Sequence, residues 1–296
     1  MVAVEQIGSA DCSLELDVAR AREGDRKALE SVIGAVQGKV YSMAMHFLWH
    51  PQDAEDATQD ILIRVITNLG NYRGEGKFHT WVYRIACNRL LTLRKQRMEK
   101  QMLSFEEFGE DLLRGVSDIS HTVEYNVDEL LLLEEVKVGC TLAMLLCLDR
   151  NHRIAYILGE IIEVDHQEAG MALEISPATF RKRLSRARST ITTFMASKCG
   201  LYNANNACQC RKRILPAIKL GRIDPEKLMF ASSLECARRF PDVLKKIRQL
   251  EDARRAAALY RSHPKSEPAK SFISWIRCAI DDRSDACAGS VVSGQT

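Results

Sequence analysis

Apolar side chains recur at helical spacing through most of this 296-residue chain, and this periodicity restricts its fold more than any other feature. Residues 17–50 predict one or two helices, and residues 61–69 supply the apolar stripe of the next one. Period-two strand patterns and hairpin dipeptides are lacking. We therefore predict an all-α fold of small helical domains, each with its own core.

Turn and capping residues divide this helical pattern into segments. Pro51 is predicted to interrupt the first helical region, and Asp53, with Asp56 three residues later, to begin the next helix. Gly70 is predicted to end that helix, and a further helix is expected over about residues 80–99.

Changes of composition along the chain indicate five regions. Residues 101–128 lose periodicity and gain glycine, serine and aspartate, which is typical of a linker. The stretch after Lys198 is rich in cysteine and asparagine, and the last residues predict a disordered tail. The predicted regions are a flexible N-terminus (1–19), a first helical domain (20–100), the linker (101–128), a second helical domain (129–197) and a mostly helical, cysteine-containing extension (198–296).

Charge is distributed unevenly, although the net charge is only +3. Residues 73–100 hold eight basic and two acidic residues, and residues 176–198 hold six basic and no acidic residues. Between them, residues 124–135 hold five acidic residues and no basic ones. The two basic segments predict contact with an anionic partner at two places.

Residues 165–194 have the pattern of a helix-turn-helix. Asp165 and Ser176 are N-cap residues for a short and a longer helix, and Pro177 suits the first turn of the second. In such a motif the second helix enters the major groove of DNA. A solvated basic face is the alternative, but the lack of acidic residues favours DNA contact. We expect base-edge contacts from Ser176, Ala178, Thr179 and Lys182, and phosphate contacts from Arg181, Arg183, Arg186 and Arg188.

Residues 71–97 bring glycine, aromatic and basic residues together. Gly74 and Gly76 allow a loop to approach a nucleic-acid strand closely. Aromatic rings offer stacking surfaces worth about 1–3 kcal/mol per base, and cations follow the backbone. We predict a loop over residues 73–80 that holds an extruded base, followed by a helix with a basic face. Trp81 stands where the two meet and serves either the core or the nucleic acid.

Two sets of motifs, in this order, resemble the extracytoplasmic-function (group 4) sigma factors of bacterial RNA polymerase, in the sigma-70 family. The first set resembles sigma region 2, over about residues 20–100, and consists of DAED (53–56) with Gln59, YRGEGKF (72–78), and WVYRIA (81–86) with Asn88. The second set, RKRLSRAR (181–188), resembles the end of sigma region 4, over about residues 130–197.

This resemblance implies a non-enzymatic factor that binds core RNA polymerase and promoter DNA and directs initiation. In the family, region 2 binds the polymerase clamp and opens the −10 element, and region 4 reads the −35 element as duplex. Carried over by position, the polymerase-binding residues are Asp53, Asp56, Gln59, Ile63 and Arg64. The implied −10 contacts are Arg73, Lys77, Phe78, Thr80, Trp81, Arg84, Asn88 and Arg89, and the helix-turn-helix residues become the −35 contacts.

His166 and Gly170 depart from the family pattern, which more often has a glutamate or an apolar residue at these positions of the first helix. A glycine inside a helix costs about 1 kcal/mol relative to alanine. We therefore expect Gly170 to weaken the first helix of the pair, and with it the affinity for the −35 element.

The extension of about a hundred residues after region 4 is left without an assigned role. Cys199, Cys208 and Cys210 are candidate zinc ligands, with Cys236 or His263 as a fourth, but their spacing is not that of a standard zinc finger. Redox sensing by Cys208 and Cys210, or a purely structural role, are the alternatives. No cofactor is assigned on this basis.

Two other functions and the cellular compartment complete the sequence-based expectations. A helix-turn-helix regulator acting without polymerase explains residues 164–195 but not the first motif set. A nucleic-acid enzyme is disfavoured because no nucleophile with a paired base, P-loop or metal-binding carboxylate set is visible. Without a signal-peptide pattern or a long apolar run, we expect a cytoplasmic protein with reduced thiols. An anti-sigma factor is a further partner that the resemblance admits.

Overall fold

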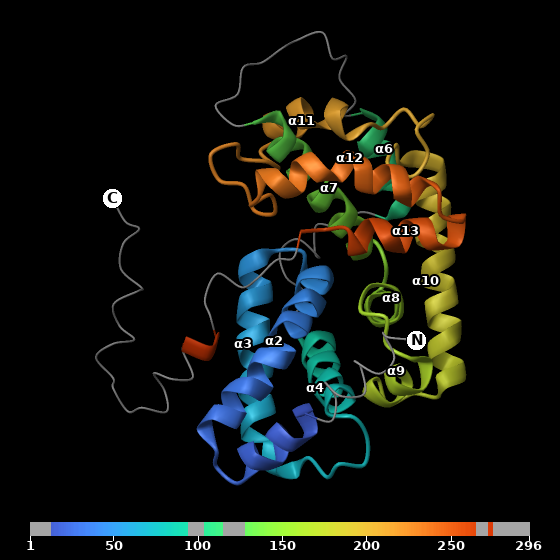
Figure 1. The fold of residues 1–296 in the computed structure, drawn as a ribbon. Helices are drawn as coiled ribbons and strands as arrows, with labels where there is room; N and C mark the ends of the chain where they lie inside the picture. The colour runs from blue at the N-terminus through green and yellow to red at the C-terminus, as the bar shows by residue number, and fades with distance from the viewer. Residues whose placement is uncertain (1–12, 94–103, 115–127, 265–271, 275–296) are drawn as a thin grey trace.

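Helices joined by short turns make up the part of the chain that the computed structural model describes, namely residues 13–93, 104–114, 128–264 and 272–274 (Figure 1). No strand occurs in these residues, and the all-α prediction is confirmed. None of their helices combines the length and apolarity that crossing a membrane requires.

The first helical unit covers residues 13–92. It consists of a helix over residues 13–22, α2 (Arg26–Leu48), α3 (Pro51–Thr67), the 3-10 turn η1 (Leu69–Asn71) and α4 (Phe78–Thr92). The helices α2, α3 and α4 pack together around a shared core to which they contribute Val36, Ile61 and Val82, respectively. The expected helix over residues 80–99 is thus present as α4 up to Thr92, and residues 94–99 lie outside the described part.

Two details of this unit differ from the sequence-based expectation. Pro51 does not interrupt a helix but begins α3, where the absence of an N–H costs nothing. His50 is the N-cap and Asp53 lies in the first turn, so the predicted start at Asp53 is wrong. Residues 13–19, expected to be flexible, form a helix whose Leu14 and Val18 are buried. An apolar stripe that has a core to pack on is ordered by that packing.

The second helical unit covers residues 129–198. It consists of α7 (Glu129–Leu146), α8 (Arg150–Tyr156), the π-helical turn η2 (Ile157–Ile161), α9 (His166–Ala172) and α10 (Pro177–Lys198). The side chains of Asp165 and Ser176 accept hydrogen bonds from the first turns of α9 and α10, which confirms both predicted caps. Phe180, Leu184 and Ile191 lie on the buried face of α10.

Part of the predicted linker is folded. Residues 105–114 form α6 (Phe105–Arg114), and Phe105 and Phe108 pack on Phe194 of α10. The linker prediction is therefore wrong for this helix. Its short apolar face was masked by the surrounding acidic residues, and its stability comes from packing on α10.

The extension begins after α10 and covers one side of the second helical unit. It contains α11 (Cys210–Lys219), α12 (Leu234–Arg248), α13 (Asp252–Arg261) and a helical turn over residues 272–274. In Figure 1, α11 and α12 lie over α7, and α13 crosses between α10 and the first helical unit. The stretch between Lys198 and Cys210 is irregular, as its composition predicted.

A buried arginine joins the two helical units. Arg153 of α8 is 2% exposed, and its guanidinium donates to the carbonyl of Phe47 in α2 and to those of Leu145, Leu146 and Leu148 at the end of α7. These carbonyls are among those that a helix end leaves without an intrahelical partner. One side chain therefore satisfies the ends of two helices from different units.

Replacing this arginine should destabilise the whole protein. For Arg153→Met we expect a loss of about 3 kcal/mol or more in the free energy of unfolding, because several buried carbonyls lose their donor at once. Urea unfolding followed by circular dichroism measures it. The control Arg254→Met, at an exposed site on α13, should change the value by less than about 0.5 kcal/mol. Equal losses for the two variants would contradict the assigned role of Arg153.

Candidate nucleic-acid interface

The loop over residues 73–77 is exposed but fixed at both ends. The Glu15 carboxylate accepts from the backbone N–H of Phe78 at 2.9 Å and lies 3.0 Å from the Tyr72 hydroxyl. The same hydroxyl lies 2.5 Å from the carbonyl of Gly76. Burial and the nearby Glu15 carboxylate raise the pKa of Tyr72, so its hydroxyl stays a donor. Gly74 has a φ of 73°, which favours glycine. The loop is thus held out from the core with its charged side chains in solvent.

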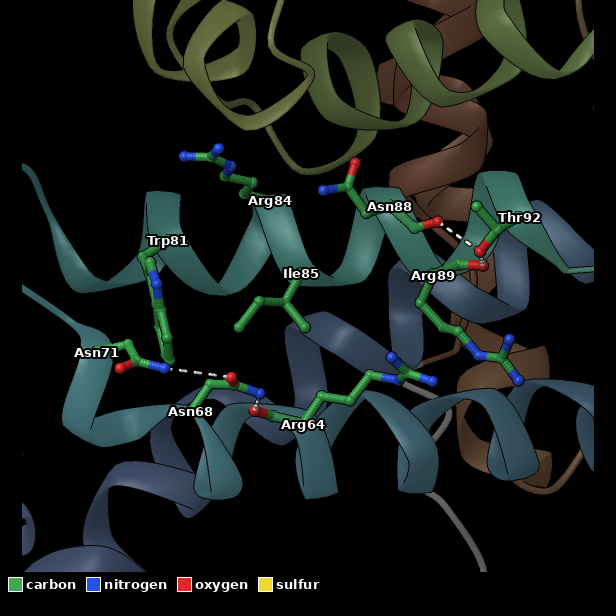
Figure 2. A pocket seen from close by; sticks show the side chains of 9 residues that line it. All are labelled: Arg64, Asn68, Asn71, Trp81, Arg84, Ile85, Asn88, Arg89 and Thr92. Atoms are coloured by element: carbon green, nitrogen blue, oxygen red, sulfur yellow. Dashed lines mark hydrogen bonds between the residues drawn. The ribbon is translucent and has the colours of Figure 1, made fainter.

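A groove of about 470 Å³ runs beside this loop between α3 and α4 (Figure 2). Figure 2 shows Trp81 and Ile85 pointing from α4 toward α3, and Arg64 lying along the opposite wall. The groove combines one aromatic ring with cations and amides. Its lining residues are Arg64, Asn68, Asn71, Trp81, Arg84, Ile85, Asn88, Arg89 and Thr92.

The predicted −10 residues fall into two groups by burial. Phe78 and Thr80 are buried, and Phe78 packs against Trp81 at a ring-centroid distance of 5.6 Å. They therefore support the loop and do not face solvent. Trp81 is half-buried, with one part against Phe78 and Tyr72 and another in the groove. The exposed or half-exposed members are Arg73, Lys77, Arg84, Asn88 and Arg89.

The predicted polymerase-binding residues share the outer side of α3, with one exception. Asp56 and Gln59 are exposed, and Asp53 and Ile63 are half-buried. Arg64 instead lies in the groove, where its Nε donates to Asp60 at 3.2 Å. Asp60 also forms an ion pair with Arg89 of α4. The structure therefore groups Arg64 with the α4 side chains.

The predicted −35 residues lie at the start of α10 and along its outer side. Ala178, Arg181, Lys182 and Arg186 border a shallow depression of about 570 Å³. Ser176 is engaged in the cap, where it accepts from the N–H of Thr179 at 3.1 Å. Two of the predicted phosphate contacts have internal partners, since Arg188 pairs with Glu160 and Arg183 lies near Asn151.

The comparisons with known proteins identify the family to which these motifs belong. The family model described as Sigma-70 region 2 matches residues 32–99. The RNA polymerase sigma-H factor of Pseudomonas aeruginosa is 28% identical over 181 residues, covering 59% of this chain and 89% of that protein. The ECF RNA polymerase sigma factor SigW of Bacillus subtilis is 26% identical over 59% of this chain and 92% of its own.

This chain belongs to the extracytoplasmic-function group of the sigma-70 family of RNA polymerase sigma factors. The family directs transcription initiation through RNA polymerase and is not enzymatic, so both predictions are confirmed. The relatives cover about 59% of the chain, which leaves an additional C-terminal portion in this sigma factor.

Two solved structures of lower similarity were also found. CnrH in complex with the cytosolic domain of CnrY has a TM-score of 0.44 and 20% identity, over 62% of this chain and 97% of CnrH. The sigma factor RpoE of Bartonella quintana, in complex with the anti-sigma factor NepR, has a TM-score of 0.40 and 18% identity, over 57% and 98%. The family assignment depends on the sequence relatives.

Cys199 and Cys208 of the extension are buried and Cys210 is half-buried, and burial raises the pKa of all three thiols. Cys199 and Cys208 are adjacent through a backbone bridge, and burial raises the pKa of Cys208 to about 11. Among the described residues, no three His, Cys, Asp or Glu side chains are arranged to hold a metal ion. This geometry supports neither the zinc hypothesis for Cys199, Cys208 and Cys210 nor a reactive thiolate pair, because a thiol with a raised pKa is a weak nucleophile.

Sequence reasoning missed the carboxylate that anchors the extension of the sigma factor. Glu135 of α7 is 2% exposed and accepts hydrogen bonds from the backbone N–H groups of Met229, Phe230 and Ala231, at 2.8 to 2.9 Å. The available signal was a glutamate in the apolar stripe of a helix, which calls for a buried donor. Its donors are backbone N–H groups, so no side chain in the sequence identifies them.

Gly170 has a packing reason that the sequence did not reveal. A Cβ atom at this position would lie 3.0 Å from the carbonyl oxygen of Ile175 and 3.3 Å from the nitrogen of Pro177. The close approach of α9 to the turn therefore requires a residue without a side chain. The expectation that Gly170 merely weakens α9 left out this contact.

Two glycine substitutions should therefore have opposite effects. Gly170→Ala should lower the melting temperature of the sigma factor, because the contact with rigid backbone outweighs the gain in helix propensity. Gly38→Ala, on an exposed part of α2 with nothing within 4 Å, should raise stability by about 0.5–1 kcal/mol. Differential scanning calorimetry of both variants measures the difference. If Gly170→Ala stabilises the protein as much as Gly38→Ala does, the packing explanation fails.

Proposed function

We propose that this sigma factor captures the opened −10 element of its promoter with the loop over residues 73–77 and the groove between α3 and α4. The observation that carries this proposal is the groove itself. Trp81 offers a stacking surface there and Arg89 a cation for phosphates. Arg84 and Asn88 extend from the same helix on the side away from α3 and offer further polar groups beside the groove. An everted base costs a few kcal/mol to extrude, which stacking and backbone contacts offset.

The loop suits a strand-binding role because its two ends are fixed and its middle is exposed. Glu15 and Tyr72 hold the ends, so binding does not have to order the whole segment. Arg73 and Lys77 then provide cations on the path toward the groove. Phe78 and Thr80, being buried, act in this proposal as the support of the loop.

Polymerase binding is assigned to the outer side of α3. Asp53, Asp56, Gln59 and Ile63 lie on this side, away from the groove that Arg64 shares with α4. This separation allows region 2 to contact the polymerase with one surface and the opened strand with another.

Reading of the −35 element is assigned to the first three turns of α10. Ala178, Arg181, Lys182 and Arg186 are exposed there and form a continuous surface. Base-edge contact falls to Ala178, Thr179 and Lys182, and phosphate contact to Arg181 and Arg186. The sigma factor is expected to act in the cytoplasm, together with its polymerase and promoter. Binding by an anti-sigma factor stays a prediction.

Transcription with purified components tests the proposal and its main alternative together. The sigma factor is mixed with core polymerase and a supercoiled promoter library, and start sites are mapped. We expect transcripts that begin at shared promoter motifs and require both proteins. Binding to duplex DNA alone, without polymerase-dependent start sites, would instead support a helix-turn-helix regulator acting without polymerase.

The loop should matter for promoter opening and not for polymerase binding. For Arg73→Ala/Lys77→Ala we expect opening, followed by permanganate reactivity of unpaired thymines, to fall roughly tenfold, equivalent to about 1.4 kcal/mol. Affinity for core polymerase should stay unchanged. The control Lys27→Ala/Lys39→Ala removes the same charge from exposed sites of α2 and should open promoters normally. An equal loss of polymerase affinity in the loop variant would show that its assigned role is wrong.

The cations of α10 should set the salt dependence of promoter binding. Arg181→Ala removes one proposed phosphate contact, so the slope of log K against log salt for holoenzyme binding should decrease by about 1. The control Lys219→Ala, at an exposed site of α11, should leave the slope unchanged. Filter binding at several salt concentrations measures both, and identical slopes for Arg181→Ala and the unmodified protein would remove Arg181 from the interface.

A further inference from the structure

The surface proposed to bind the −10 element packs against the first helix of the helix-turn-helix. Lys77 pairs with Glu168 of α9 at 2.7 Å, and Arg84 of α4 pairs with Glu174 in the turn after α9. Arg150 adds hydrogen bonds to the carbonyls of Leu91 and Leu93 at the end of α4. In Figure 2, Arg84 points from α4 toward the helices above it and away from the groove. Two proposed DNA contacts are thus occupied by acidic residues of the same chain.

This packing is incompatible with simultaneous binding of both promoter elements. Positions −10 and −35 are separated by about 25 base pairs, or roughly 85 Å of duplex at about 3.4 Å per base pair. Here α4 contacts α9, and only residues 173–176 separate α9 from the start of α10, the proposed −35 reading end. Even the whole of α10, at about 1.5 Å per residue, is only about 33 Å long.

The extension holds the two helical units in this arrangement because it touches both. On the first unit, Phe230 packs edge-on to Trp49 at 5.4 Å, and His263 stacks on His46 at 5.6 Å. On the second unit, Glu135 binds the N–H groups of residues 229–231. The Tyr260 hydroxyl donates to the carbonyl of Thr141 at 3.0 Å.

The ion pairs between the α4 and α9 segments are weaker than the buried contacts of the extension, and this difference allows the two helical units to separate. The Lys77–Glu168 and Arg84–Glu174 pairs are partly exposed, and such pairs contribute little to stability. The anchors in the extension are buried. Burial lowers the pKa of His46 to about 4 and lowers that of His263, so the stacked rings are uncharged near neutral pH. The buried contacts of the extension therefore supply most of the free energy that holds the two helical units together. The ion pairs contribute little to it and cover Lys77 and Arg84, two of the proposed DNA contacts.

We propose that the C-terminal extension is an intramolecular clasp that holds region 4 against the −10 surface of region 2, so that the unbound sigma factor is closed and must open to form the promoter complex. This inference rests on the proposed function, because it regulates the same surfaces. The apparent affinity for core polymerase is then reduced by the fraction of molecules that is closed.

A distance measurement tests closure directly in the full-length protein. Dyes are attached through noncanonical amino acids at Lys39 on α2 and Ser189 on α10, which are exposed and outside the proposed contacts. Energy transfer should be high in the unbound protein and fall when core polymerase and promoter DNA are added. Unchanged transfer in a complex that has opened its promoter would overturn the clasp.

Substitutions at the contact test whether closure limits activity. Glu168→Lys/Glu174→Lys places like charges against Lys77 and Arg84, and should lower energy transfer in the unbound protein. Affinity for core polymerase should rise about fivefold or more, a size typical of coupling between sites. The control Glu23→Lys/Glu226→Lys makes the same charge change at exposed sites elsewhere and should leave both measurements unchanged.

A second variant changes the contact between α7 and the extension and leaves the ion pairs between α4 and the α9 segment in place. Glu135→Gln weakens the hold on residues 229–231 and should also lower energy transfer, with circular dichroism used to verify folding. If both variants leave energy transfer and polymerase affinity unchanged while the protein still supports transcription, the clasp is wrong and the proposed function stands. If the unmodified protein neither binds core polymerase nor supports transcription, the proposed function itself fails.

Discussion

The guanidinium of Arg153 collects the carbonyl groups at the ends of α2 and α7 inside the protein, and the arrangement of the two helical units depends on it. A buried cation is costly unless its donors are used, and here Nε and both terminal nitrogens have carbonyl partners. Because Phe47 belongs to the first helical unit and Leu145 to the second, this single side chain fixes how the two units meet. The contact between α4 and α9, and the ion pairs that cover Lys77 and Arg84, follow from that placement.

A second buried ionisable residue, Glu135, fixes the extension in place, as Arg153 fixes the two helical units. Glu135 satisfies three consecutive backbone N–H groups, and this fixes the segment that carries Phe230 onto Trp49. Trp49 itself has a left-handed φ of 73°, a conformation that costs about 1–3 kcal/mol for a residue other than glycine. Its indole N–H donates to the carbonyl of Gly139 at 2.9 Å, so the strain is offset by contacts with α7 and the extension. Closure thus depends on a few buried polar contacts and one aromatic pair.

The sequence predicted the candidate site unevenly, and the reasons are physical. The caps at Asp165 and Ser176 and the buried stripe of α10 were correct because they depend on residues close in the chain. The start of α3 was misplaced because Pro51 begins that helix and does not break one. The helix α6 and the ordered residues 13–19 were missed because each packs against distant residues. Gly170 was misjudged for the same reason, since the turn backbone that approaches it belongs to the next element.

The sequence by itself determined the all-α class and the helix-turn-helix, because periodicity and caps are local properties, and the spacing of its motifs predicted the order of the two sigma regions. It also carried the likeness that places the chain in its family. Only the tertiary structure decided which predicted contacts face solvent, such as Arg73, and which are enclosed, such as Phe78. It alone revealed the partners of Lys77 and Arg84 and the anchoring role of Glu135. Burial and ion pairing are set by residues far apart in the chain, and no local pattern records them.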